Sequence, residues 1–552
     1  MTARVGWWVA VVFVLGCSSK SNPEFCDEAT ACPGDDLVCD LAIHECIADP
    51  MVAACEDDDP TDCPNGEPFC TDGRCSGCTS ALGCDGTTPI CEISVGECRG
   101  CTDSQDCIEQ LSLPVCAEDG RCVTCTAEAG CDGTTPICDD GTCRACTSDA
   151  ECDVLCDEPT GRCVDPDEVL FFDPTGTDEA ICTRADPCSY LSVLPIRIVP
   201  QTRWVVFAPG IYPPYAATIE LDHAVTFEAE GATFGPLTLA AGELSIEGGT
   251  VRPTLTCGNT TTRGNLTLTD VTVRGTVDLV NCVAEADRID IDAGDAGAAA
   301  KALDVAPPST LVLRTSTVRH GSIGANVYGQ LEATDSVFTG ATDTGMKVVG
   351  RALLAACRIE QNYLGLLLGE VTAIPPYLKL DRSIVSGNSY LGMKLANGEY
   401  DVTSSFIVEN GDGTRPGALT IAGGMTGTIR FVTIAGNGHQ VEGCGRTDTT
   451  CTVWPQISCL GNQAIDDSIV SLVGSNRIGS GPPSGCTGSN SGANLCTPAY
   501  VDADPITPTV DYHLGAATTC RGTGMGTPPA TDYDGEVRPR GVGTEIGADE
   551  IE

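Results

Sequence analysis

Regularly spaced cysteines dominate the first third of this 552-residue chain. Of its 36 cysteines, 24 lie between Cys26 and Cys163 and form six groups of four. From Cys78 onward, each group begins three residues after the previous one ends, as Cys98 and Cys101 show. A unit of about 20 residues buries too little apolar surface to offset its chain entropy, so it needs covalent closure. The spacing therefore predicts small crosslinked units over residues 26–163.

The first sixteen residues form an apolar leader with one positive charge, at Arg4. Such a leader is typical of a processed secretory signal and is too short to remain as a membrane-spanning helix. Its end, Val14-Leu15-Gly16-Cys17, resembles the lipobox of bacterial lipoproteins. The resemblance implies a signal peptide at 1–16, acyl chains on Cys17 and a lipidated tether at 17–25. We therefore expect a protein anchored to the bacterial outer membrane or cell surface, with the periplasmic face as the alternative.

The crosslinks within the cysteine groups are either disulfides or zinc sites. Cys75, Cys78, Cys98 and Cys101 match the spacing C-x₂-C-x₁₅₋₂₀-C-x₂-C of a zinc site. Two further cysteines lie within that span, and the thiols of an exported chain are oxidised. We therefore predict disulfides and no metal, with a connectivity that the spacing does not determine.

The charge balance restricts the partners of the chain. It carries 77 acidic and 30 basic residues, for a net charge of −47. Nucleic acid and anionic membrane surfaces require clustered Lys and Arg, so we expect neither as a partner. Within 26–163 the acidity predicts an extended, self-repelling stalk. Weak Ca²⁺ binding by its aspartates is the alternative, and no cofactor is expected.

After Val164 the sequence changes to short apolar strands that recur at intervals of about 20 to 28 residues, the range of solenoids. A strand such as 311–313 is followed by a second apolar strand near Val318 and by a third strand, which in several coils begins with glycine. Three strands per turn predict an all-β, three-sided prism. We assign an N-terminal cap to 164–203, the coils to 204–475, and loops with a C-terminal cap to 476–552.

Four asparagines follow the second strand in successive units: Asn362, Asn388, Asn410 and Asn437. An asparagine at such a corner can adopt the left-handed conformation and hydrogen-bond the amide of the next coil. We predict that the four stack as a ladder with a structural role.

This pattern resembles the right-handed parallel β-helix of pectin-lyase-like proteins, a family that includes pectate lyases, polygalacturonases, phage tailspikes and bacterial surface proteins. The flanks at 172–190 and 204–212 are similar to the opening of extracellular members. The segments 511–514, 532–539 and 545–550 are similar to the "DxDGxxRP…DIGAxE" ending of that surface-protein group. The resemblance implies the fold and an exported context, and it implies no chemistry.

Eleven cysteines lie in this second region. Closeness in sequence, or a separation of about one coil, predicts these disulfides: Cys182 with Cys188, Cys257 with Cys282, Cys444 with Cys451, and Cys486 with Cys496. Because eleven is odd, one thiol stays unpaired. We assign that role to Cys357, on a predicted core strand, since a free cysteine packs like a small hydrophobe.

Enzymes of the pectin-lyase-like family hold Ca²⁺ with carboxylates beside a basic residue, or combine several aspartates with a His and an Arg-Lys pair. The candidates here are Asp466, Asp467 and His439. In the hydrolases the aspartate doublet precedes the His, whereas here it follows, and no Arg-x-Lys lies nearby. We therefore expect solvated surface residues and no catalytic site.

Four basic residues occupy strand positions in neighbouring coils: Lys347, Lys394, Arg358 and Arg382. On one face of the prism they could bind acidic polysaccharide by charge pairing. Long side chains on a solvent-facing sheet are the alternative. The function that we expect is that of a non-catalytic surface lipoprotein for adhesion, or for glycan or matrix binding. The alternative is a polysaccharide lyase or glycoside hydrolase that acts on uronic-acid polymers.

Overall fold

The computed structural model describes residues 84–437 with short gaps at 85–87, 93–96, 112–114, 127–130, 132, 178, 298, 370–373, 412–416 and 423–424. Beyond this range it describes short stretches between 37 and 76 and between 457 and 548. The contacts divide the chain into two units, Met1–Val164 and Asp165–Glu552. Within the described residues, no helix is both long and apolar enough to cross a bilayer.

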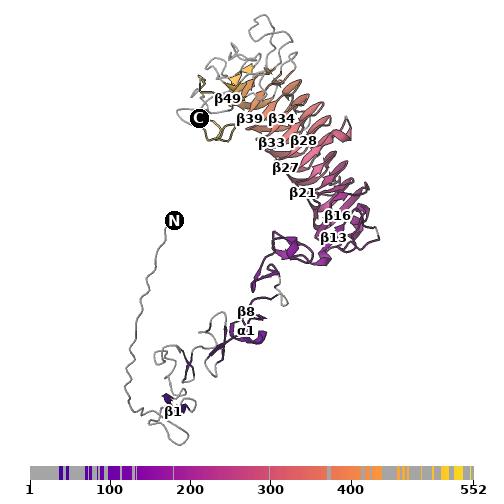
Figure 1. Cartoon of the computed structure of the whole chain (residues 1–552). Helices are drawn as coiled ribbons and strands as arrows, with labels where there is room; N and C mark the ends of the chain where they lie inside the picture. Colours follow the sequence, from indigo (N-terminus) through magenta and orange to yellow (C-terminus); the bar gives the residue numbers. More distant parts are fainter. Residues whose placement is uncertain are drawn as a thin grey trace, which may run out of the picture. The chain divides into compact units, whose positions relative to one another are not determined.

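The first unit consists of antiparallel hairpins, one for each cysteine group (Figure 1). The strand pairs are β1 (Leu37–Asp40) with β2 (Glu45–Ala48), β3 (Phe69–Thr71) with β4 (Arg74–Ser76), β5 (Ile90–Glu92) with β6 (Glu97–Arg99), β7 (Val115–Cys116) with β8 (Cys122–Val123), β9 (Ile137–Asp139) with β10 (Thr142–Arg144), and β11 (Cys156–Asp157) with β12 (Arg162–Cys163). Helix α1 (Ser104–Leu111) precedes β7. In every hairpin the third and fourth cysteines of the group are register partners, as Cys138 and Cys143 are.

Disulfides close these units, and the structure also gives their connectivity. The described bridges are Cys84–Cys98, Cys101–Cys116, Cys107–Cys122, Cys125–Cys138, Cys131–Cys143, Cys146–Cys156 and Cys152–Cys163. Wherever both bridges of a group are described, the first cysteine pairs with the third and the second with the fourth. Sulfurs of the two bridges lie within 4.8 Å of one another in each of these groups. As disulfides they offer no thiolate to zinc.

Ion pairs couple neighbouring units at the two-residue linkers. Arg99, in the linker before Cys101, donates to Asp106 of the next unit at 2.9 Å. Arg144 donates in the same way to Glu151 at 2.7 Å, and this hydrogen bond is the main reason why the pKa of Glu151 falls to about 2. Adjacent units in this part of the stalk are therefore joined by side-chain contacts as well as by the chain.

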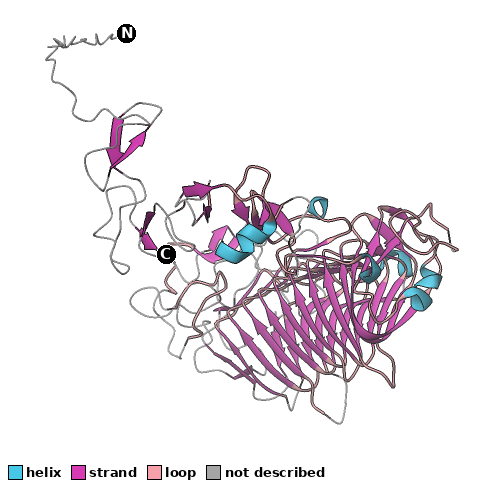
Figure 2. Cartoon of the chain, turned by 90° about the horizontal axis from the view of Figure 1, so that it is seen from below, coloured by secondary structure: helices cyan, strands magenta, loops and turns pink. Residues whose placement is uncertain are grey.

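The second unit is a parallel β-solenoid with three faces, which we call A, B and C in chain order (Figures 1 and 2). Each coil places one short strand on each face, and each strand pairs with the equivalent strand of the next coil, as β27 (Thr310–Arg314) pairs with β30 (Gln330–Thr334). Leu, Ile, Val and Ala side chains inside the prism form one continuous buried core. The predicted all-β, three-sided architecture is confirmed.

The strands of each face follow in chain order. Face A consists of β13 (Val169–Phe172), β14 (Trp204–Phe207), the second halves of β16 (Ala217–Glu228) and β18 (Leu237–Glu247), β21 (Gly264–Thr269), β24 (Cys282–Asp287), β27, β30, β33 (Arg351–Ala355), β36 (Tyr377–Asp381), β39 (Glu399–Thr403), β42 (Thr426–Arg430), β45 (Gln463–Asp466) and β47 (Cys486–Thr487). Face B consists of β15 (Gly210–Ile211), β17 (Ala232–Phe234), β19 (Thr250–Val251), β22 (Thr272–Val273), β25 (Asp290–Asp292), β28 (Thr317–Arg319), β31 (Val337–Thr339), β34 (Arg358–Glu360), β37 (Ile384–Ser386), β40 (Phe406–Val408), β43 (Thr433–Ala435) and β46 (Ile469–Val470). Face C consists of the first halves of β16 and β18, β20 (Thr254–Cys257), β23 (Thr276–Leu279), β26 (Lys301–Val305), β29 (Ile323–Val327), β32 (Thr344–Val348), β35 (Leu364–Leu368), β38 (Leu391–Leu395), β41 (Leu419–Ile421) and β44 (Ile457–Cys459).

The asparagine ladder forms at the corner between faces B and C. The backbone N–H of Asn362 donates to Oδ1 of Asn388 at 3.0 Å, and Asn388 bonds Asn410 in the same way at 3.1 Å. All four asparagines are buried. The left-handed residue, however, is the one before each asparagine, such as Gln361 with φ 56° or Glu409 with φ 57°. The prediction of left-handed asparagines is therefore wrong by one position, while the ladder itself is present.

Serines form a second buried line at the corner between faces A and B. The N–H of Ser316 donates to Oγ of Ser336 at 3.2 Å, and the N–H of Ser383 donates to Oγ of Ser405 at 3.1 Å. Cys357 takes the serine position of its own coil and donates its N–H to Ser383 at 3.0 Å. It is an unpaired, buried thiol, as predicted, although it lies at a corner and not on a strand. Burial raises its pKa to about 11.

Both flanks of the solenoid are partly described. The N-terminal cap contains η3 (Pro166–Glu168), η4 (Leu191–Val193) and the short helix α2 (Leu194–Arg197), and the predicted bridge Cys182–Cys188 is present there. Near the C-terminus, β48 (Tyr500–Asp502) and β49 (Asp511–Leu514) form a hairpin. The ring of Tyr533 packs on that of Phe406 on face B, with centroids 4.7 Å apart, and the N–H of Ala548 donates to Thr433. The described parts of the terminal motif therefore pack against the side of face B.

Candidate functional site

The four basic residues considered for glycan binding do not lie on one face. Lys347 on β32 and Lys394 on β38 both belong to face C, where Leu367 lies between them in register. Arg358 is on face B and donates to Glu360 at 2.7 Å. Arg382 lies at the corner between faces A and B, 3.5 Å from a carboxylate oxygen of Asp381. Only the two lysines therefore remain as a pair on a common surface.

Several other sequence candidates lie outside the described residues. Asp466 is the last residue of β45, where it is the register partner of Arg430, but its side chain is not described. Asp467 and His439 lie outside the described part of the chain, as do the lipidation candidate Cys17 and the side chains of the predicted pairs Cys444–Cys451 and Cys486–Cys496. The predicted bridge Cys257–Cys282 is present between adjacent coils.

A cluster of charged side chains spans three coils of face B. Asp292 on β25 accepts from Arg274 of the preceding coil at 2.8 Å. It also accepts from His320 of the following coil at 2.6 Å, and Asp290 accepts from Arg319 at 2.6 Å. The two carboxylates and two guanidinium groups therefore neutralise one another.

The protonation of this cluster does not suit acid catalysis. Burial raises the pKa of Asp292, but hydrogen bonds from His320 and Gly294 and the nearby Arg319 outweigh it, so the net pKa lies below its ordinary value. A general acid that cleaves a glycosidic bond needs a carboxyl group with a raised pKa. We interpret the cluster as an ion-pair network that links coils.

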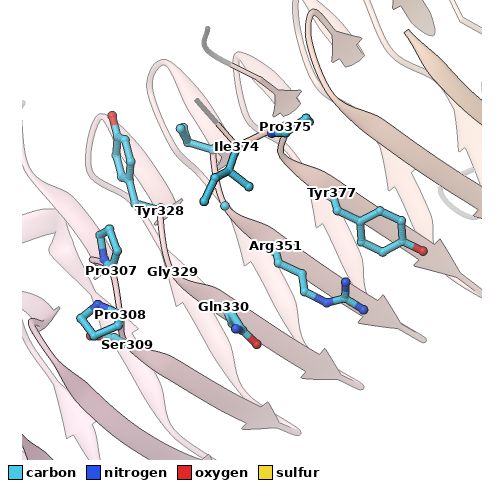
Figure 3. Close-up of a pocket in the computed structure, with 12 residues that line it drawn as sticks. Pro307, Pro308, Ser309, Tyr328, Gly329, Gln330, Arg351, Ile374, Pro375 and Tyr377 are labelled. Atoms are coloured by element: carbon cyan, nitrogen blue, oxygen red, sulfur yellow. The ribbon is translucent and has the colours of Figure 1, made fainter. Parts of the chain in front are cut away.

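A pocket of about 550 Å³ lies at the corner between faces C and A. Its floor contains the first residues of successive face-A strands, because Gln330, Arg351 and Tyr377 are register partners. The Arg351 guanidinium lies 4.7 Å from the centroid of the Tyr377 ring, and Figure 3 shows these two side chains next to each other. Tyr328 and Ile374 rise beside this row, and both are exposed. The pocket thus combines aromatic and aliphatic walls with a cation and an amide.

Unequal connections between faces C and A create this hollow. The turns at 328–329 and 349–350 are tight, and a Cβ on Gly350 would lie 2.2 Å from the carbonyl oxygens of Tyr328 and Gly329, so only glycine permits the stacking. In the next coil, β35 ends at Leu368 and β36 begins only at Tyr377, and the described residues Ile374 and Pro375 between them line the pocket. On the other side, Pro307 and Pro308 lie in the connection before β27. The pocket lies over the tight turns, between the two longer connections.

None of the pocket residues was singled out in the sequence. The signal was present as prolines between strands, at 307–308 and 375–376, where neighbouring coils have a turn that ends in glycine. To recognise these prolines as the edges of one pocket, the connections of neighbouring coils must be aligned with one another, and only the strand register provides that alignment.

The chain is similar to one protein family and to solved structures. Residues 79–169 match a family of unknown function (DUF8331). Among solved structures, a pectate lyase, Pel9A, is 12% identical with a TM-score of 0.36, over 70% of this chain and 96% of the lyase. No curated protein matches the chain significantly.

Proposed function

We propose that this protein is a non-catalytic surface lipoprotein whose solenoid binds glycans at the pocket between faces C and A. The observation that carries the proposal is the lining of the pocket, where Tyr328 and Tyr377 lie near Arg351 and Gln330. Binding sites of this size combine mostly apolar walls with a few polar groups that fix orientation.

The chemistry of a sugar ring fits this lining. A pyranose presents a C–H face that packs on an aromatic ring and hydroxyl groups that hydrogen-bond at its edge. The tyrosine rings offer such faces at low conformational cost. Arg351 and Gln330 offer donors, and the Arg351 guanidinium can also pair with an anionic substituent.

Loss of both pocket tyrosines should abolish glycan binding. On a glycan array, we expect the full-length protein to bind and the variant Tyr328→Ala with Tyr377→Ala to lose at least tenfold in affinity, because two stacking surfaces are removed. The control is Tyr215→Ala between β15 and β16, another exposed tyrosine that packs on a second tyrosine ring. Unchanged binding by the double variant would refute the pocket. Unsaturated or reducing products released from a bound polymer would favour the lyase or hydrolase alternative.

The lipid anchor is the second part of the proposal and rests on Val14-Leu15-Gly16-Cys17. Replacing Cys17 with Ser should release the protein into the soluble fraction, because acyl chains on that sulfur would be the attachment. Fractionation of cells with metabolic acyl labelling measures this. Persistent membrane association of the variant, with no label on the wild type, would contradict it.

A further inference from the structure

A second aromatic surface lies on the coil that forms one wall of the pocket and on the coil after it. Tyr363 comes directly before β35 and Tyr390 directly before β38, at the corner between faces B and C. Their rings stack with centroids 4.9 Å apart and planes 5° apart. Because Tyr363 is 46% exposed, the stacked pair presents aromatic surface to solvent.

Strand β35 connects this tyrosine pair to the pocket. Tyr363 precedes its first residue, and the pocket residues Ile374 and Pro375 lie between its end and β36. A strand of this length spans roughly 17 Å at the usual rise per residue. The two aromatic surfaces therefore lie at opposite margins of face C, separated by a distance that a short oligosaccharide covers.

The surface between the two margins carries two lysines. One row along face C runs through Asn326, Lys347, Leu367 and Lys394, which are consecutive register partners. Lys347 and Lys394 thus lie on either side of β35, the strand that runs from Tyr363 towards the pocket.

The same row is acidic in the earlier coils. There it passes through Asp278 and Asp304, and Asp304 accepts from Lys301 and from Asn326, each at 2.7 Å. Burial and the neighbouring Asp304 raise the pKa of Asp278. An anionic polymer is therefore favoured over the later coils, where the lysines are, and disfavoured over the earlier ones.

We infer that the glycan is a linear, anionic chain that lies across face C from the pocket to the stacked pair of Tyr363 and Tyr390. This inference rests on the proposed function and adds the direction, the length and the charge of the ligand. Lys347 and Lys394 pair with its sulfate or carboxylate groups, while the tyrosines at both margins stack on its rings. At moderate ionic strength the net charge of the whole protein is screened beyond about 10 Å, so the local lysines decide the attraction.

The test uses size-fractionated dextran sulfate and unsulfated dextran of matched length, titrated into the full-length protein. We expect affinity for dextran sulfate to rise with chain length until the chain spans face C, and then to level off. Tyr363→Ala with Tyr390→Ala should weaken binding of the long chains about tenfold and leave the shortest unchanged. Lys347→Gln with Lys394→Gln should reduce the preference for dextran sulfate over dextran about tenfold. Tyr215→Ala and Arg263→Gln, an exposed cation in an earlier coil, are the matched controls.

The outcomes separate this inference from the proposed function. If Tyr328→Ala with Tyr377→Ala abolishes binding but the Tyr363 and Tyr390 variant keeps the full length dependence, the glycan does not cross face C. Equal binding of dextran and dextran sulfate, or an affinity that does not depend on length, also overturns the inference. Binding that survives the loss of the pocket tyrosines instead contradicts the proposed function.

Discussion

Reduction of the full-length protein should unfold the stalk units between residues 84 and 163 and leave the solenoid folded. Each described bridge of the stalk closes a loop with a sequence separation of 10 to 15 residues. The closure of such a loop contributes about 3 kcal/mol. A stalk unit has little other stabilisation, since one apolar cluster consists of the buried side chains of Ile90, Cys101 and Cys107 with the partly buried Cys116 and Cys122. Limited proteolysis with mass spectrometry, with and without reductant, measures the effect.

The solenoid provides the internal control for reduction. Its core extends from Phe172 to Ile434 and depends on burial rather than on crosslinks. Without reductant, the variant Cys257→Ser with Cys282→Ser should keep a protease-resistant stalk. The bridge that it removes joins two coils of the solenoid and none of the stalk units. A stalk that resists protease under reductant would contradict the account, as would stoichiometric zinc bound to reduced cysteines.

Asn388→Ala should destabilise the solenoid by about 3 kcal/mol, because buried hydrogen-bonding groups lose their partners at about 1 to 3 kcal/mol each. Oδ1 of Asn388 accepts from the N–H and the side-chain amide of Asn362, and its own amide donates to Asn410 at 2.7 Å. Urea unfolding followed by far-UV circular dichroism measures this loss. Asn265→Ala, on an exposed position of β21, is the control and should stay within about 0.5 kcal/mol of the wild type. Equal stability of the two variants would show that the ladder does not stabilise the fold.

The same ladder explains the glycines at the second position of the face-C strands β32, β35 and β38, each of which begins one residue before the glycine that the sequence predicted as its start. A Cβ on Gly365 would lie 2.7 Å from the side-chain nitrogen of Asn388 and 2.5 Å from the carbonyl oxygen of Gly392. The asparagine side chains therefore occupy the space beside these residues, and glycine is required by close approach. Sequence reading identified both features, the glycines and the asparagines, without the contact that relates them.

Local periodicity was enough to predict the coils and the ladder, since alternating strands and corner residues recur within each repeat. Properties that depend on contacts between repeats were not predictable. The disulfide connectivity is one such property. The hairpin places Cys116 opposite Cys122, but each of these two cysteines is bridged to an earlier cysteine of its group. The separation of Arg358 from Lys347 follows from the corners, because a shift of a few residues along a coil moves a side chain to another face. The pocket depends on connections of unequal length in neighbouring coils.

The central claim is that the pocket between faces C and A holds a glycan. A crystal structure of the full-length protein with an oligosaccharide that it binds tests this most directly. We predict sugar rings packed against Tyr328 and Tyr377, with Arg351 in hydrogen-bond contact. Sugar bound instead at the Asp290 and Asp292 cluster of face B, with the pocket empty, would contradict the account.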